Sequence, residues 1–136
     1  MPVDFSSHRD STYVCLTGHG DILDAELIAA LQLMYANEED TKRHRCALMD
    51  FSRSSNVDVS SEGIREAARL NLAASKLMAP GVAVAIVVSK PLTYGLGRMW
   101  QSYAENTGWT TSVFEDLDEA KSWLEGSLEQ GLEETD

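Results

Sequence analysis

The sequence lacks any apolar run long enough to cross a membrane as a helix. Its longest run covers residues 82–88, whereas a helical span needs roughly 18 such residues. The first residues, Met-Pro-Val-Asp-Phe-Ser-Ser-His, contain neither the basic region nor the apolar core of a signal peptide. We therefore expect no membrane span and a cytoplasmic location.

Cysteine is equally scarce. The two cysteines, Cys15 and Cys46, both lie inside apolar segments that resemble strands. In a cytoplasmic protein, such residues are usually buried thiols rather than a disulfide. Oxidation across adjacent strands stays an alternative, because spacing alone does not exclude it.

Positive charge is also in short supply. The net charge is −11, and residues 115–136 hold nine acidic residues and one lysine, which leaves −3 for the rest. The one basic cluster, residues 42–45, directly follows acidic residues 38–40, so we interpret it as a solvated loop. Nucleic-acid binding needs a basic face that displaces counterions from phosphates. We therefore expect no nucleic-acid partner.

The motifs of common catalytic and metal sites are missing. There is no Gly-x-Ser-x-Gly elbow, and His8, His19 and His44 lack the spacing of a zinc site. Gly95-Leu-Gly97 lacks the remaining glycine of a dinucleotide-binding loop and more plausibly permits close helix packing. Aspartates at strand ends (Asp21, Asp24, Asp50 and Asp58) could meet around a divalent cation, but they lack a calcium-loop pattern. We expect no enzyme, no cofactor and no metal.

What the sequence does contain is regular alternation of strands and helices. The 136 residues are 43% hydrophobic and 24% charged, as in an ordinary soluble domain. We predict strands at residues 12–17, 46–51, 82–88 and 110–114, with a shorter one at 3–7. The first helix is capped by Asp21 or Asp24 and runs to about residue 37, and the second begins near residues 58–61 and runs to about residue 78. The third has Pro91 in its first turn and ends before residue 106, and the capping-box segment 116–119 opens the last. Residues 38–40 and 52–56 are predicted as a turn and a loop.

This order predicts one α/β domain over residues 1–125, followed by an acidic tail, residues 126–136, that frays. Residues 82–88 are apolar at every position, which is typical of a central parallel strand with helices on both faces. Strand–helix–strand repeats of this kind form right-handed crossovers and a mostly parallel sheet.

Part of the sequence also resembles a known family of proteins. The segment Val113-Phe-Glu-Asp-Leu-Asp-Glu-Ala-Lys-Ser-Trp-Leu124 resembles the last strand and helix of uncharacterised bacterial SpoIIAA-like proteins. Gly18, Asp50 at a strand end and Gly97-Arg98-Met99 are similar to that family too, and the likeness spans roughly residues 12–126. It implies a SpoIIAA-like (STAS-type) fold, related to Sec14-type lipid-binding domains. The expected sheet has four to five strands, mostly parallel or mixed, with four helices.

The same resemblance implies a candidate phosphorylation site. STAS antagonists carry a phosphorylated serine at the start of the helix after the second main strand, and Asp58-Val-Ser60-Ser61-Glu62-Gly63 occupies the similar place. Glu62 separates the serines from the glycine, which departs from the family pattern. We favour the simpler interpretation that Ser60 and Ser61 cap the helix, and keep phosphorylation of either as the alternative.

A second group of candidate residues lies on the helix that starts at Pro91. Large side chains gather there, and we expect most of them to pack against the sheet. A homodimer face, or the wall of an apolar cavity, are the alternatives. The candidate ligand or interface residues, with two strand-end aspartates, are Asp50, Asp58, Tyr94, Leu96, Arg98, Met99, Trp100 and Tyr103.

These observations predict a non-enzymatic STAS-like protein-interaction or regulatory domain. The alternative is a carrier or sensor of a small apolar or lipid-like ligand, as the Sec14 relationship implies. An apolar pocket larger than about 300 Å³ would favour the ligand, and a flat apolar patch would favour association.

Overall fold

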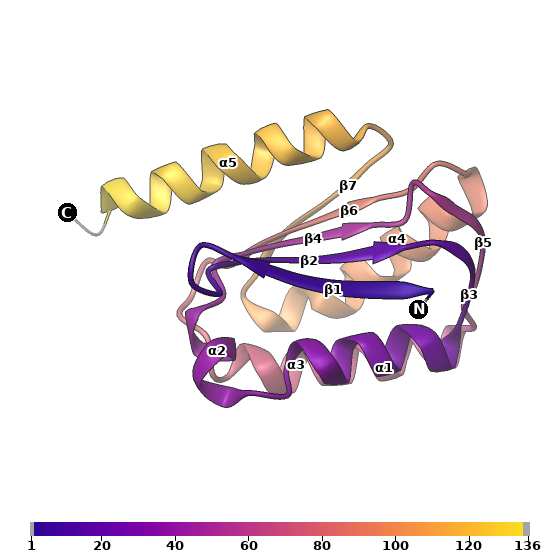
Figure 1. Cartoon of the computed structure of the whole chain (residues 1–136), viewed down its shortest axis with the longest axis horizontal. Helices are drawn as coiled ribbons and strands as arrows, with labels where there is room; N and C mark the ends of the chain where they lie inside the picture. Colours follow the sequence, from indigo (N-terminus) through magenta and orange to yellow (C-terminus); the bar gives the residue numbers. More distant parts are fainter. Residues whose placement is uncertain (1, 135–136) are drawn as a thin grey trace.

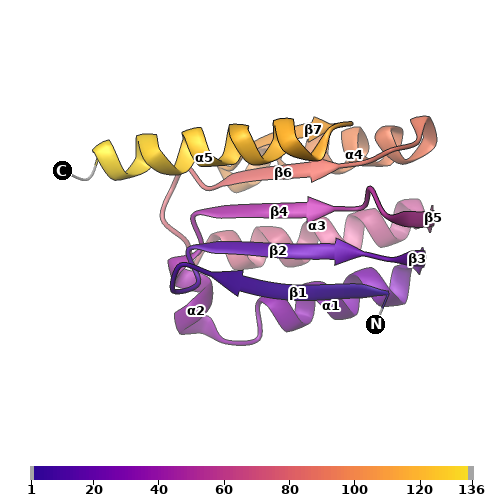
Figure 2. The ribbon, with the colours of Figure 1, turned by 45° about the horizontal axis from the view of Figure 1, so that its top comes forward.

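The chain is built on a five-stranded mixed sheet in the order β1-β2-β4-β6-β7 (Figures 1 and 2). The computed structural model describes residues 2–134, with side chains through residue 128 apart from Leu92. β1 (Val3–His8) pairs antiparallel with β2 (Tyr13–Gly18). β4 (Cys46–Asp50), β6 (Ala83–Val87) and β7 (Thr110–Phe114) follow, all parallel to β2. The predicted α/β order and mixed sheet are confirmed.

Helices cover the two faces of the sheet unequally. α1 (Asp24–Met34), α3 (Ser61–Ser75) and α4 (Pro91–Ala104) pack on one face. α5 (Leu117–Glu134) lies alone on the other, above the sheet in Figure 1. β4 and β6 are buried at every position because both of their faces are covered. α5 packs mainly on β4, β6 and β7, so it leaves the α5 side of β1 and β2 without a helix over it.

A fifth, short helix replaces the turn predicted at residues 38–40. This is α2 (Glu38–Arg43). The Asn37 side chain accepts a hydrogen bond from the Asp40 amide at 3.0 Å, and ion pairs one turn apart join Lys42 to Glu39 and Arg43 to Asp40. The prediction that residues 42–45 form a solvated loop was wrong, since Lys42 and Arg43 are helical and His44 is buried.

A separate parallel pair of strands was also missed. β3 (Gly20–Leu23) and β5 (Ser54–Asp58) form a two-stranded sheet beyond the carboxyl ends of β2 and β4. We call it the mini-sheet. The predicted loop at residues 52–56 is therefore partly strand. Gly20 has a φ of 62°, which allows the chain to turn after β2. The side chain of Ile22, in β3, is fully buried.

The carboxyl-terminal helices complete the structure. α4 continues into the short 3₁₀ helix η1 (Glu105–Thr107), and Gly108 ends it with a φ of 78°. A Cβ at Gly97 would lie 3.3 Å from Val113, so this glycine permits the predicted close packing, whereas Gly95 faces open space.

α5 is helical to Glu134, past residue 125, and residues 135–136 of the predicted tail lie outside the described part. The domain boundary itself stays a prediction. Within residues 2–134, no helix is long and apolar enough to cross a membrane.

Candidate functional site

The amino-terminal end of α3 is the most highly organised polar feature at the carboxyl end of the sheet. Ser60 is the N-cap of α3, and its Oγ accepts a hydrogen bond from the Gly63 amide at 3.0 Å. The same hydroxyl donates to Asp24 Oδ2 at 2.5 Å, and the Ser60 amide donates to Asp24 Oδ1 at 2.7 Å. One carboxylate from the start of α1 therefore holds the start of α3.

Asp24 explains two features of the sequence. It was predicted as a cap of its own helix, but the N-cap of α1 is Leu23, which makes no side-chain hydrogen bond. Asp24 instead reaches across to α3. A Cβ at position 63 would overlap its carboxylate, so Gly63 leaves the room that the carboxylate needs. The Asp24 carboxylate therefore explains why position 63 is a glycine.

Like Ser60, Ser61 is exposed. It is the first residue of α3, and its hydroxyl makes no hydrogen bond to another described residue. Arg65, one turn later, donates from Nε to the Ser61 carbonyl at 3.4 Å, so a guanidinium lies beside this residue. The exposed acids Asp58 and Glu62 lie near it in sequence. Of the two predicted serines, only Ser61 offers an accessible hydroxyl without a structural role.

The strand-end aspartates do not come together. Asp50 is buried, and its Oδ1 accepts hydrogen bonds from the Ser52 amide at 2.9 Å and the Ser52 hydroxyl at 2.6 Å. Asp50 pairs in register with Thr17 and Val87, which places it on the α5 face of the sheet, opposite α1 and Asp24. Asp58 ends β5 and is exposed. Among the described residues, no three His, Cys, Asp or Glu side chains are arranged to hold a metal ion.

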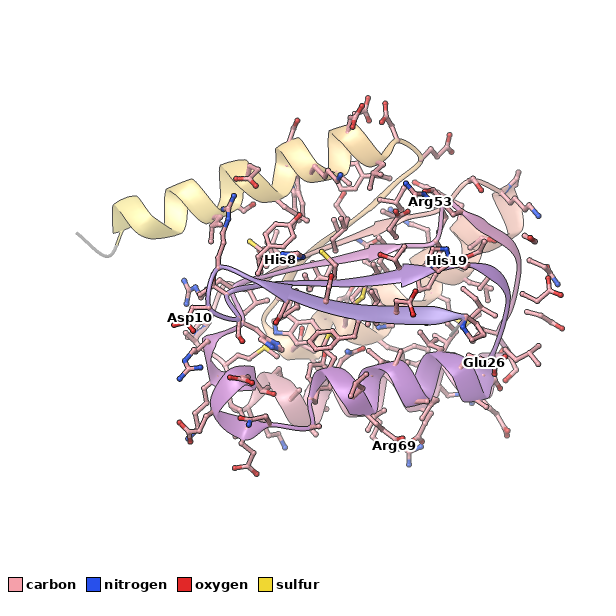
Figure 3. The ribbon with its side chains drawn as sticks, in the orientation of Figure 1. His8, Asp10, His19, Glu26, Arg53 and Arg69 are labelled. Atoms are coloured by element: carbon pink, nitrogen blue, oxygen red, sulfur yellow. The ribbon has the colours of Figure 1, made fainter. Side chains whose placement is uncertain are left out.

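The three histidines are likewise dispersed. His8 lies within 3.3 Å of Ser6, and His19 contacts Asp4 at 3.2 Å. Figure 3 labels His8 and His19 at well-separated points of the β1–β2 hairpin, with Arg53 beyond the end of β4. His44 is buried, and burial lowers its pKa from the ordinary value despite the opposing charge of Asp40.

The large side chains of α4 divide between core and surface. Trp100 is buried, and its Nε1 donates to Asn71 Oδ1 at 2.8 Å. Leu96, Met99 and Tyr94 pack partly buried against the same core. Arg98 is exposed, with no ion pair to the described acids. Tyr103 is 42% exposed, but the other large exposed apolar side chains described, Leu23 and Leu33, belong to β3 and α1. Tyr103 therefore stands apart from them in the chain.

An apolar cavity lies between α4 and the mini-sheet. Its volume is about 60 Å³, and Leu96, Gly97 and Trp100 form one wall. Ile22, Val57 and Val59 form another, and the two polar residues in the lining are Asn71 and Thr93. Ligand pockets usually measure about 300–1,000 Å³. The cavity is in the predicted place but is too small, as it stands, for a lipid-like molecule.

One residue and one contact in these sites were not predicted from the sequence. Asn71 is buried on α3, where it receives the Trp100 bond and donates to the Tyr35 hydroxyl at 2.8 Å. The polar asparagine at a helical position facing the core was a detectable signal. The Asp24–Ser60 contact left no such signal, because it joins residues 36 positions apart on two helices.

Comparisons with known proteins identify the fold and no more. No protein-family model matches the sequence, and no curated protein matches it. Among solved structures, the chain is similar to an uncharacterized protein from the DUF3478 family with a SpoIIAA-like fold, from Shewanella loihica PV-4. The two share 19% sequence identity at a TM-score of 0.54, over 90% of this chain and 91% of the other. The SpoIIAA-like fold expected from the sequence is thus confirmed.

Proposed function

We propose that this chain is a non-enzymatic protein-interaction domain whose contact surface is the amino-terminal end of α3. The observation that supports the proposal is a difference in hydrogen bonding: the Ser60 hydroxyl is bonded to Asp24 and Gly63, and the Ser61 hydroxyl is not. Asp24 and Gly63 fix the Ser60 hydroxyl, so the end of α3 is held in place. Ser61 then presents a free hydroxyl on a fixed surface, as the resemblance to STAS domains implies for a regulatory serine.

Phosphorylation of Ser61 is the proposed control of this surface. A phosphate there adds a charge of about −1.5 to −2 near the free amides of a helix end, whose positive dipole end favours it. Arg65 lies one turn away, within reach of a charge-assisted hydrogen bond. Asp58 and Glu62 oppose the phosphate. The modification therefore changes the surface charge while leaving the Asp24–Ser60 contact intact.

Site-specific crosslinking tests the proposal. A photoreactive amino acid replaces Ser61 in one variant and exposed Ser102 of α4 in a matched control. We expect a defined protein to be captured from the native cells at position 61 and not at position 102. That protein should then bind purified Ser61→Ala and Ser61→Asp with affinities that differ by tenfold or more, about 1.4 kcal/mol. Equal capture at both positions, or equal affinities, contradicts the proposal.

The apolar cavity supports a second candidate function, the binding of a small apolar ligand. Nearly all of its lining is apolar, and the mini-sheet covers it as a separate layer. An occupant of lipid size requires the mini-sheet and α4 to separate. Native mass spectrometry of freshly purified protein tests this candidate. A co-purifying apolar mass supports it, and a bare chain unaffected by added fatty acid contradicts it.

A further inference from the structure

The uncovered half of the sheet forms a polar groove on the face opposite α1, α3 and α4. α5 stands over β4, β6 and β7, so an open space of about 390 Å³ lies between it and the β1–β2 hairpin. Tyr13, Cys15 and Leu48 form its floor. His8 and Arg9 of the hairpin form one wall, and Lys121 and Glu125 of α5 form the other. Figure 3 shows His8 on the side of the sheet that faces α5.

The hairpin turn fixes one end of this groove. Arg9, Asp10 and Ser11 have φ angles of 54°, 58° and 66°, so three successive residues other than glycine adopt the left-handed conformation. The turn is held by Thr12, whose amide and hydroxyl both donate to the Arg9 carbonyl, at 3.2 and 2.7 Å. Arg9 Nη2 contacts both carboxylate oxygens of Glu125, at 2.9 and 3.2 Å. This pair closes the end of the groove and balances the Glu125 charge.

Lys121 is the charge that remains. Its side chain is exposed at the groove, and it forms no ion pair with an acid among the described side chains. It lies close enough to Cys15 for its charge to act on the thiol, although burial still raises the pKa of Cys15 overall. With Arg9 and Glu125 paired, Lys121 is the one unpaired charge among the residues that line the groove, while the buried Asp50, on the same face of the sheet, acts on Cys15 in the opposite sense.

The floor of the groove is aromatic and apolar, unlike its charged walls. The Tyr13 ring is half-buried, with the His8 ring edge-on at 6.3 Å and the Arg9 guanidinium 5.8 Å from its centroid. Burial and the neighbouring Cys15 and Glu125 raise the pKa of Tyr13 to about 12, so its hydroxyl keeps its proton and can donate a hydrogen bond. Leu48 and Cys15 add apolar and polarisable surface. Such a floor suits a planar, mostly apolar ring.

We propose that this groove is a binding site for a small aromatic carboxylate. The ring lies on Tyr13, Cys15 and Leu48, and the carboxylate pairs with Lys121. The volume of about 390 Å³ falls within the usual range of ligand pockets. The site is independent of the function proposed for Ser61, because the two lie on opposite faces of the sheet.

Benzoate titration of the ¹⁵N-labelled full chain tests the assignment, with benzyl alcohol as the uncharged control of equal ring size. We expect saturable amide shifts at Tyr13, Cys15 and Lys121 with benzoate and at least tenfold weaker binding of benzyl alcohol. Lys121→Gln, an exposed change that removes the positive charge, should weaken benzoate binding about tenfold and leave the benzyl alcohol titration unchanged. Ser61→Ala should bind benzoate as the unmodified chain does, whatever becomes of the interaction surface.

Thiol labelling provides a second readout. Cys15 is half-buried and lines the groove, whereas Cys46 is buried and serves as an internal control. Saturating benzoate should slow alkylation of Cys15 by iodoacetamide several-fold without changing the rate at Cys46. The assignment is overturned if benzoate produces no saturable shift, if its shifts map elsewhere, or if Lys121→Gln binds it unchanged.

Discussion

The contact between Asp24 and Ser60 is the connection on which the α3 surface depends, and a double-mutant cycle measures it. Asp24→Ala removes two hydrogen bonds to a charged acceptor, from the Ser60 amide and hydroxyl. Bonds to charged groups contribute about 1.5–3 kcal/mol each, and the partial exposure of Asp24 favours the lower end. We expect a loss of about 2–3 kcal/mol in the free energy of unfolding.

Ser60→Ala and the double variant complete the cycle. Loss of the N-cap costs about 1 kcal/mol, and loss of the bond to Asp24 adds about as much. The hydroxyl–carboxylate bond is removed in both single variants, so it is counted twice when their effects are added. The double variant should therefore lose about 1 kcal/mol less than that sum.

Urea denaturation of the four chains gives these free energies, and thermal melts follow them at about 3–5 °C per kcal/mol for a chain of this length. Asp21→Ala, an exposed change on β3, is the matched control and should stay within about 0.5 kcal/mol. Additive effects of Asp24→Ala and Ser60→Ala would refute the reasoning, since they would mean that the two side chains do not act on each other.

Three further predictions concern the core. Gly18→Ala would place a Cβ 2.5 Å from Ile22, 2.7 Å from Ser54 and 2.8 Å from Phe51, so we expect a loss of about 1–3 kcal/mol in urea titrations, whereas Gly95→Ala, which meets nothing, should be neutral or stabilising. Asn71→Leu leaves the buried Trp100 N–H without its acceptor and the Tyr35 hydroxyl without its donor, and should cost about 2–4 kcal/mol; a loss below 0.5 kcal/mol would contradict the hydrogen-bonded network. Because the pKa of His44 is lower in the folded chain, stability should fall as the pH drops below the unfolded value of about 6.5, by at most about 1.4 kcal/mol per pH unit. His44→Phe should lose less stability than the natural chain between pH 7.5 and 5.5, and parallel profiles would show that His44 is not the group responsible.

The main sheet was predictable because burial on two faces leaves a mark in the sequence. β6 is buried on both faces and is apolar at every position, and β4 is apolar at every position except its last, Asp50. The cap of α3 was equally visible, since serine is a standard N-cap and Ser60 fills that role. Local chemistry and the periodicity of apolar residues were enough for these elements.

The elements that were missed depend on contacts between distant segments. The mini-sheet pairs residues 20–23 with residues 54–58, and neither segment is apolar enough to read as a strand alone. α2 is held by ion pairs within six charged and polar residues, a composition shared with solvated turns. Asp24 looked like a cap of its own helix, and only the fold brings it to Ser60.

The mini-sheet has a consequence for how the two candidate sites communicate. β5 ends two residues before Ser60, and Val57 and Val59, on either side of its last residue, line the apolar cavity. Ile22 of β3 lines the cavity from the neighbouring strand, two residues before α1 starts at Asp24. A molecule that pushed these strands apart would also move the Asp24–Ser60 contact. Binding in the cavity and binding at α3 are then thermodynamically linked, and by reciprocity each must change the affinity of the other by the same factor.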